Sequence, residues 1–179
     1  MTGSGNLNVG LQRLLNPETE NKRQLEYRGG VFREGDKVMQ IKNNYDVEYE
    51  GADGKPEKGI FNGDIGIIER VYEKELCLAV LFDDKRVIYP REMLDELEPA
   101  YAVTVHKSQG SEWPAVILPL FDCPDMLSTR NLLYTAVTRA RKQLILVGSE
   151  KKIAQMVQNN ISNKRYSGLK FLLKEYTGQ

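Results

Sequence analysis

The stretch Tyr101-Ala-Val-Thr-Val-His-Lys-Ser-Gln-Gly-Ser-Glu112 joins a short apolar segment to a polar loop that contains a glycine. Regular elements are predicted around this loop in the order strand 101–105, strand 115–118, helix 131–142 and strand 143–147. Both of the first two strands are apolar enough to be buried, and Ser128 or Thr129 can cap the helix. Strands that alternate with helices indicate an open α/β sheet with helices packed against it.

The chain before this stretch follows a different pattern. Leucines at helical spacing predict a short helix that ends at Asn16-Pro17, and the charged residues 18–30 are typical of a connecting segment. Residues 43–59, rich in glycine and charge, are predicted to be a long exposed loop. Short apolar runs separated by tight turns predict strands at 38–41, 65–68, 76–82 and 86–89. Such strands indicate a small, strongly bent β-barrel over residues 31–98.

Two amphipathic helices are predicted after Gly148. The first is marked by Ile153, Met156, Val157 and Ile161, and the second by Leu169, Leu172, Leu173 and Tyr176. We therefore divide the chain into residues 1–30, 31–98, 99–150 and 151–179.

Composition excludes several classes of protein. The 179 residues carry 25 basic and 25 acidic side chains, a balance that argues against binding nucleic acid by bulk charge. The charge is uneven: −6 over residues 1–100, +1 over 101–150 and +5 over 151–179. Cys77 and Cys123 are too few for a disulfide framework or a zinc site and are predicted to be small apolar core residues. The chain has no apolar run of the roughly 18 residues that would cross a membrane and no signal peptide, so we expect a cytoplasmic protein without a membrane partner or a metal site.

Two groups of residues could carry chemistry. In the loop at 104–112, a glycine and Lys107 could bring backbone N–H groups and a positive charge to a phosphate, although a solvated loop in which Gly110 supplies a turn has the same pattern. On a helix over 131–142, Arg139 and Arg141 would lie about 160° apart and would serve different ligands. An arginine at the rim of a packed helix can be aimed along a cleft, although surface arginines are common.

Specific motifs in this sequence resemble those of superfamily 1 helicases of the RecD/TraA type. Tyr101 to Trp113 resembles motif V, and Leu133-Tyr-Thr-Ala-Val-Thr-Arg-Ala-Arg141 resembles motif VI at the spacing of the family. Gly35-Asp-Lys-Val-Met-Gln40 and Phe61-Asn-Gly-Asp-Ile-Gly66 resemble the block before motif V, and Leu11 to Pro17 resembles the stretch leading into it. The resemblance extends to about Gly148.

The resemblance implies a fold and a set of roles. The fold is a RecA-like second motor domain, an open and mostly parallel sheet flanked by helices, with an inserted small SH3-like β-barrel that helps to grip DNA. Arg139 is implied to be an arginine finger on the γ-phosphate of ATP, and further nucleotide contacts fall on Gln109, Gly110 and Glu112. Contacts with single-stranded DNA fall on Thr104, His106, Lys107 and Ser108. Asn62 is a further candidate for DNA, but an Asn-Gly turn explains it equally well.

The phosphate-binding loop that such an enzyme needs is missing from this sequence. Gly54-Lys55 is followed by Pro56, and position 49 is Tyr where the motif needs Gly. The carboxylate that holds Mg²⁺ is missing as well. We therefore expect a fragment of an ATP-dependent DNA helicase that moves toward the 3′ end of DNA. The N-terminal motor domain of the same polypeptide would supply most contacts to ATP and Mg²⁺, and the isolated chain would neither hydrolyse ATP nor unwind DNA.

Two other functions fit parts of the sequence. A stand-alone nucleic-acid-binding module would explain the missing phosphate-binding loop, but it would have no use for an arginine finger. A hydrolase could use His106 with Ser108 or Ser111, but the sequence offers them no acidic partner and no nucleophile elbow. An upstream extension of the reading frame into a phosphate-loop domain would separate the first alternative from a helicase.

Overall fold

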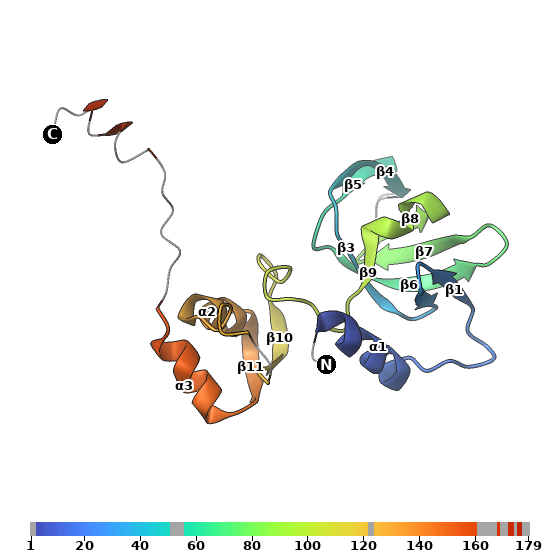
Figure 1. The fold of residues 1–179 in the computed structure, drawn as a ribbon. Coiled ribbons are helices and arrows are strands. Elements are labelled where there is room, and N and C mark those ends of the chain that lie inside the picture. Colours follow the sequence, from blue (N-terminus) through green and yellow to red (C-terminus); the bar gives the residue numbers. More distant parts are fainter. Residues whose placement is uncertain are drawn as a thin grey trace.

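The computed structural model describes residues 3–50, 56–121 and 124–160, together with positions 168, 172–173 and 175–176. Figure 1 shows two parts: a β-rich part built from residues up to Pro99 and a smaller α/β part built from residues after it. Helix α1 (Ser4–Leu15) lies between them in the same view. None of the helices in the described residues is both long enough and apolar enough to span a membrane.

The N-terminal segment contains one predicted element and one that was not predicted. Helix α1 ends at Leu15 with Asn16 as its C-cap, which confirms the helix stop at Asn16-Pro17. The prediction of a connecting segment over 18–30 is wrong, because β1 (Gln24–Tyr27) pairs with β2 (Gly30–Arg33) in an antiparallel hairpin. Arg28 and Gly29 both have positive φ, as the tight two-residue turn of a hairpin requires.

The main sheet of the β-rich part has seven strands in the order β5-β4-β8-β7-β6-β3-β9. Every neighbouring pair in it is antiparallel. The strands are β3 (Lys37–Gln40), β4 (Asn44–Glu50), β5 (Pro56–Ile60), β6 (Ile65–Tyr72), β7 (Cys77–Phe82), β8 (Lys85–Tyr89) and β9 (Leu97–Pro99), with a 3₁₀ helix η1 (Arg91–Glu96) before β9. The short strands and tight turns are as predicted, and closure into a barrel stays a prediction.

The long exposed loop predicted over residues 43–59 is wrong. Strands β4 and β5 pair there, with Glu48 opposite Lys58 in the register. These two side chains form an ion pair at 2.8 Å, and the Tyr49 hydroxyl donates a hydrogen bond to Glu57. Charges that looked like those of a solvated loop therefore face one another across a hairpin, where opposite charges favour pairing.

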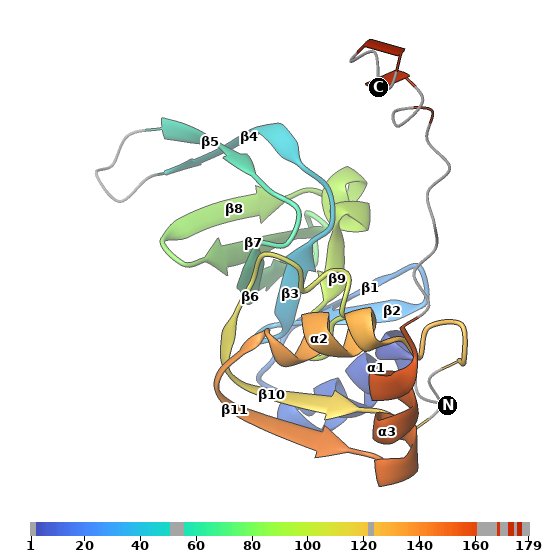
Figure 2. The ribbon, with the colours of Figure 1, turned by 90° about the vertical axis from the view of Figure 1, so that its left-hand side faces the viewer.

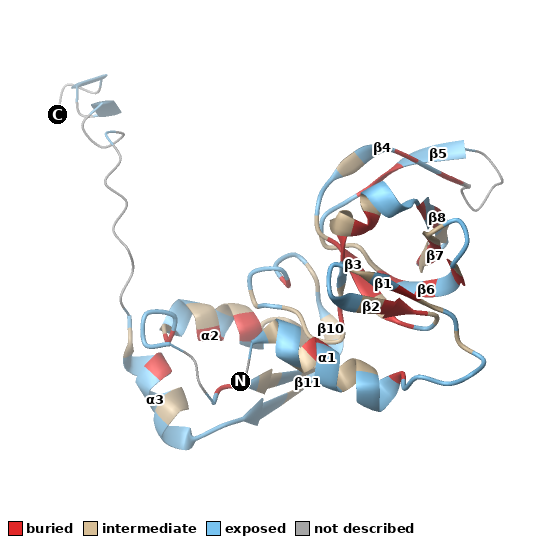
Figure 3. Cartoon of the chain, turned by 45° about the vertical axis from the view of Figure 1, so that its right-hand side comes forward, coloured by how far each residue is buried: buried red, intermediate tan, exposed pale blue. Residues whose placement is uncertain are grey.

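The core lies mostly within the β-rich part, as the buried residues in Figure 3 show. Its buried apolar members come from every strand of the main sheet, from the β1–β2 hairpin and from η1: Leu25, Phe32, Val38, Val47, Tyr49, Ile60, Ile68, Val71, Leu78, Val80, Phe82, Val87, Tyr89, Leu94 and Leu97. Cys77, predicted to be a core residue, is only partly buried and is not a member of this core, while Cys123 lies outside the described residues.

The α/β part is a parallel βαβ unit. Strands β10 (Trp113–Pro119) and β11 (Ala140–Val147) pair in parallel, and α2 (Arg130–Val137) connects them with Thr129 as its N-cap. Figure 2 shows α2 and α3 (Glu150–Gln158) beside the two strands. Parallel strands joined through a helix are the expected α/β pattern, and the wider RecA-like sheet stays a prediction.

Three predictions for the α/β part are wrong. Residues 101–105 form bends and turns in place of a strand. The helix ends at Val137, and residues 140–142 belong to β11 because Ala140 pairs with Trp113 at the start of β10. The strand predicted to be buried at 115–118 is largely exposed, with Ile117 66% exposed.

The C-terminal helices are only partly described. Helix α3 contains Ile153, Met156 and Val157 as predicted, and Met156 is buried. Ile161 lies outside the described residues. Of the second predicted helix, Leu172, Leu173 and Tyr176 are helical and exposed, and Leu169 lies outside the described residues.

Candidate functional site

The segment that leads into the loop at 104–112 is anchored by α1. The Asn8 side chain donates to the Ala102 carbonyl and accepts from the Ala102 N–H, both at 2.8 Å. The Tyr101 hydroxyl donates to the buried carboxylate of Asp36 at 2.8 Å. The Asn8 side chain thus satisfies both backbone hydrogen-bonding groups of Ala102, which are therefore not available to a strand ladder.

Asp36 connects four segments of the chain. Its carboxylate accepts hydrogen bonds from the side chains of Gln12 and Asn16 on α1 and its end, from the Arg33 N–H and from Tyr101. Burial and the hydrogen bond to this carboxylate raise the pKa of Tyr101 to about 12. A buried carboxylate with this many donors holds its surroundings in one arrangement. Asp36 thus fixes where the loop at 104–112 begins, a role that the sequence pattern did not reveal.

The loop itself is a series of tight turns. The Ser108 N–H donates to the Thr104 carbonyl at 3.0 Å, and the Lys107 N–H donates to the Thr104 hydroxyl at 3.3 Å. Gly110 has φ +88° and would meet nothing on gaining a Cβ, so its backbone conformation alone requires glycine. The turns therefore hold a short polar loop with a defined shape.

The side chains of this loop point in different directions. Thr104, His106, Lys107 and Gln109 are exposed. Ser108 is 5% exposed, and its hydroxyl donates to the Val105 carbonyl at 2.7 Å. Lys107 forms an ion pair with Glu98 at the surface. The Ser108 hydroxyl is therefore engaged with the backbone and not with His106, so it lacks the contact that a hydrolase built on Ser108 and His106 would need.

Arg139 is held against the far end of the same loop. Its guanidinium donates to the Thr135 carbonyl at 3.1 Å, the Thr138 hydroxyl at 3.1 Å and the Ser111 carbonyl at 3.0 Å. Its own carbonyl accepts from the Trp113 N–H at 2.9 Å. Arg139 follows the helix and does not lie on it, so the predicted helical rim position is wrong. The contacts nevertheless fix the arginine against the loop.

Arg141 has a separate partner. It lies on β11, and its Nε donates to the Glu112 carboxylate at 2.8 Å in an exposed ion pair. The predicted angle of about 160° on one helix is therefore wrong, because neither arginine is helical. The two side chains still have different partners: Ser111 and Glu112, which are adjacent in the loop. Glu112 is thus engaged by Arg141 in this structure.

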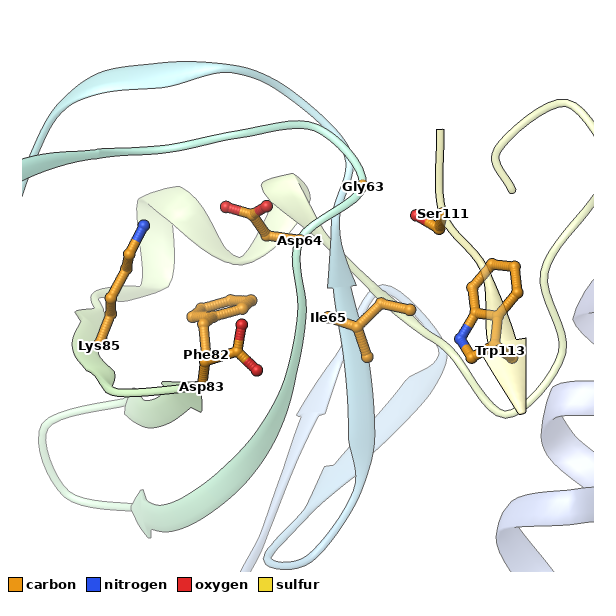
Figure 4. A pocket seen from close by; sticks show the side chains of 8 residues that line it. All are labelled: Gly63, Asp64, Ile65, Phe82, Asp83, Lys85, Ser111 and Trp113. Atoms are coloured by element: carbon orange, nitrogen blue, oxygen red, sulfur yellow. The ribbon is translucent and has the colours of Figure 1, made fainter. Parts of the chain in front are cut away.

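Asn62 lies in the tight turn between β5 and β6. The Gly63 N–H donates to the Gln40 carbonyl at 2.9 Å, and the Asn62 N–H donates to the Asn43 side chain at 2.9 Å. The Asn62 side chain is exposed, and its turn forms one wall of a hollow of about 250 Å³. Figure 4 shows Ser111 and Trp113 on the opposite side of this hollow. Its lining is Gly63, Asp64, Ile65, Phe82, Asp83, Lys85, Ser111 and Trp113.

The structure thus brings some predicted site residues together and leaves one apart. Arg139 contacts Ser111 near the end of the loop that carries His106 and Gln109, and Glu112, the next residue of that loop, is paired with Arg141. Asn62 stands across the hollow from that loop end. Trp113 was not among the predicted site residues, because only the fold brings it to the turn at Asn62. Among the described residues, no cluster of His, Cys, Asp or Glu could hold a metal ion.

Comparison with known protein families assigns both parts of the chain. Residues 7–82 match the family described as the ATP-dependent RecD-like DNA helicase SH3 domain. Residues 99–147 match the UvrD-like helicase C-terminal domain. The resemblance to RecD-like helicases of superfamily 1 is confirmed. The loop at 104–112 and Arg139 lie within the segment that matches the UvrD-like helicase C-terminal domain.

Curated relatives show the same resemblance. The chain is 38% identical over 147 residues to the ATP-dependent RecD2 DNA helicase of Deinococcus radiodurans, an alignment that covers 82% of this chain and 18% of that protein. It is 36% identical over 119 residues to the RecBCD enzyme subunit RecD of Haemophilus influenzae, covering 65% of this chain and 17% of that protein. This RecD-like chain therefore spans less than a fifth of the length of either relative.

Proposed function

We propose that this chain is the C-terminal part of an ATP-dependent DNA helicase of the RecD type. In this proposal Arg139 acts on the γ-phosphate of ATP, and residues Thr104, His106, Lys107 and Ser108 of the loop contact single-stranded DNA. Translocation toward the 3′ end follows from the family resemblance. A longer polypeptide supplies the phosphate-binding loop, and the isolated chain is inactive without it.

The observation that carries the proposal is the hydrogen bond from Arg139 to the Ser111 carbonyl. It joins the proposed nucleotide-contacting residue directly to the end of the proposed DNA-contacting loop. If DNA displaces the loop, the Arg139 guanidinium would therefore move or lose this hydrogen bond. An enzyme that couples ATP hydrolysis to movement on DNA needs such a connection between its two ligands.

The residues present fit one side of a nucleotide site. An arginine side chain has five N–H groups. In the described part of the chain, three of those of Arg139, one on each guanidinium nitrogen, donate to protein oxygens. The other two can donate to phosphate oxygens. The exposed Gln109 side chain and the backbone at Gly110 lie in the same loop. ATP bound there would supply the phosphoryl group, while Arg139 would bind and orient its terminal phosphate.

Magnesium needs carboxylates that this site does not provide. In the described residues, Glu112 is already paired with Arg141, and no acidic cluster has the makeup of a metal site. Mg²⁺ in phosphoryl-transfer enzymes is held by an acidic residue near the phosphate-binding loop. We therefore assign Mg²⁺ and most phosphate contacts to the N-terminal motor domain of the same polypeptide.

DNA contact in this proposal depends on a few exposed side chains. Thr104, His106 and Lys107 are exposed on one loop, and Asn62 is exposed on the turn across the hollow. Ser108 contributes to the shape of the loop because its hydroxyl is turned inward. A motor must release DNA at each step, so a few positioned contacts suit it better than a strongly basic surface.

Exposed strands support the need for a longer polypeptide. Ile117 on β10 and Ile145 and Leu146 on β11 are exposed, although parallel sheets are normally covered on both faces. Additional chain packed against β10 and β11 would remove these side chains from water. The preceding part of a helicase is the occupant that we propose.

The proposal is tested in the longer polypeptide by separating turnover from DNA binding. Arg139→Ala should lower DNA-stimulated ATP hydrolysis by about 10³-fold or more and leave affinity for single-stranded DNA within about twofold. Lys107→Ala should lower DNA affinity and reduce the slope of log affinity against log salt by about 1.

Arg141→Ala is the matched control, because its ion pair with Glu112 is exposed and exposed pairs contribute little. It should change turnover much less than Arg139→Ala. Equal losses from the two arginine variants would contradict the assignment of Arg139 to the phosphate.

A stand-alone nucleic-acid-binding module is the second candidate, and the exposed side chains of Thr104, His106, Lys107 and Asn62 favour it because they could contact a strand without a nucleotide. It predicts that Arg139→Ala changes no measurable activity in the natural polypeptide. It also predicts a reading frame that does not extend upstream into a phosphate-loop domain.

A further inference from the structure

Two large aromatic side chains lie next to one another on the surface of the β-rich part. Tyr45 on β4 is 65% exposed, and Phe61, just after β5, is 42% exposed. Their ring centroids are 5.7 Å apart, and the ring planes meet at 72°. Single exposed apolar side chains are common on proteins, but two adjacent exposed rings form a distinct recognition surface.

Hydrogen bonds fix the backbone that carries these rings. The Phe61 N–H donates to the Asp64 carboxylate at 2.9 Å, and the Asn62 N–H donates to the Asn43 side chain at 2.9 Å. In the described part of the chain, the exposed Asn62 side-chain amide makes no hydrogen bond. The surface therefore combines aromatic rings with an amide that can both donate and accept, which suits the edge of a nucleobase.

Charge does not favour phosphate at this surface. Lys42 is paired with Asp95 at 2.9 Å, and Lys58 is paired with Glu48 at 2.8 Å. Residues 1–100 carry a net charge of −6. A strand of nucleic acid would therefore be held here through its bases, since stacking on a ring needs no net positive charge.

The aromatic pair continues into the proposed DNA-binding site. Gly63 and Asp64, which directly follow Phe61 and Asn62 in the turn between β5 and β6, line one wall of the hollow, and Ser111 and Trp113 line the opposite wall (Figure 4). Ser111 lies three residues after Ser108, the last residue of the loop that we assign to DNA. A strand leaving that loop thus meets the turn that carries Phe61.

We propose that Tyr45 and Phe61 form a base-stacking platform for single-stranded nucleic acid, with the Asn62 amide at its edge. The inference rests on the proposed function, because it extends the DNA path from the loop at 104–111. Binding at this platform depends on the bases and responds little to salt. Binding at Lys107 depends on phosphates and weakens as salt rises.

The test is an NMR titration of the 179-residue chain at high protein concentration, with oligo(dT) and with an abasic strand of equal length. Oligo(dT) should shift the ring resonances of Tyr45 and Phe61, and the abasic strand should do so at least about fivefold more weakly. The double variant Tyr45→Ala/Phe61→Ala should lower oligo(dT) affinity about tenfold, by the same factor at 50 and 200 mM salt, and leave abasic binding unchanged. Ile88→Ala, an exposed apolar side chain on the same sheet, and Tyr134→Ala, an exposed aromatic on α2, are the controls and should change neither affinity.

Other outcomes separate the two proposals. Shifts confined to residues 104–111 would overturn the platform and leave the proposed DNA-binding loop intact. Equal shifts of Tyr45 and Phe61 with both strands would overturn base stacking. A lack of shifts at both places would overturn the platform together with the DNA contacts of the loop. The platform would also be overturned if the double variant bound oligo(dT) more weakly than wild type at 50 mM salt but equally well at 200 mM salt.

Discussion

The β-rich part and the βαβ unit contain similar apolar residues but bury them to different extents. In the β-rich part, Leu78 and Val80 on the central strand β7 are fully buried. In the βαβ unit, the buried cluster within the described residues consists of Leu120, Leu133 and Met156, while Ile117 on β10 is exposed. The first part completes its own core, and the second presents apolar strands that need further chain to cover them.

The largest expected effect on stability tests this difference directly. Leu78→Ala should lower the free energy of unfolding by about 2–5 kcal/mol, because it leaves a cavity in a closed core. Ile117→Ala should change it by less than about 0.5 kcal/mol in this chain, because the side chain is already in water. Urea unfolding followed by circular dichroism measures both. Comparable losses in the two variants would mean that β10 is buried in solution and that the contrast is wrong.

Two glycines show how closely the chain is packed at single positions. A Cβ on Gly66 of β6 would lie 2.7 Å from the Leu81 carbonyl oxygen, so Gly66→Ala should cost about 1–3 kcal/mol by overpacking. A Cβ on Gly10 of α1 would meet nothing within 4 Å, so Gly10→Ala should stabilise by about 0.5–1 kcal/mol. Thermal unfolding of both variants provides the test. A neutral Gly66→Ala would show that β6 and β7 are not packed as closely as described.

The smallest expected effect concerns the connection between the two parts. The pKa of Tyr101 is raised to about 12, so the folded protein holds this proton more tightly than the unfolded chain does. Its contribution to stability is complete below about pH 10 and is lost as the pH rises toward 12. Tyr101→Phe should lower the free energy of unfolding by about 1 kcal/mol near neutral pH. As the pH rises from 10 to 12, the variant should lose less stability than the wild-type protein does.

The measurement for Tyr101 is the free energy of unfolding across that pH range. Burial also raises the pKa of Tyr89, so ionisation of Tyr89 makes the stability of the wild-type protein and of Tyr101→Phe depend on pH in the same way. Identical pH profiles for wild type and Tyr101→Phe would show that the contact with Asp36 does not persist in solution.

Local signals in the sequence were enough for several elements of the fold. The stop at Asn16-Pro17 and the tight turn at Asn62-Gly63 act within a few residues, and both appear in the structure. The β4–β5 hairpin was missed because Glu48 and Lys58 look like loop charges until their strands pair. The strand expected at 101–105 is absent, and the Ala102 backbone bonds instead to the side chain of Asn8, which lies 94 residues earlier in the chain.

The candidate site shows the same limit. The motif around Arg139 made this residue a candidate, but its spacing suggested a helical position that the pairing of Ala140 with Trp113 prevents. The contact from Arg139 to Ser111 spans 28 residues and depends on β10 and β11 lying side by side. Sequence periodicity describes one element at a time, so it could not place these two groups against one another.

The central claim is that this chain contributes Arg139 to an ATP site completed by the preceding part of a longer helicase polypeptide. The direct measurement is ATP hydrolysis by this chain, by the preceding part that contains the phosphate-binding loop, and by their mixture, each with and without single-stranded DNA. The account predicts no hydrolysis by this chain alone, DNA-stimulated hydrolysis by the mixture, and a loss of about 10³-fold or more when the chain carries Arg139→Ala. Hydrolysis by this chain alone that depends on Arg139, or a mixture unaffected by Arg139→Ala, would contradict it.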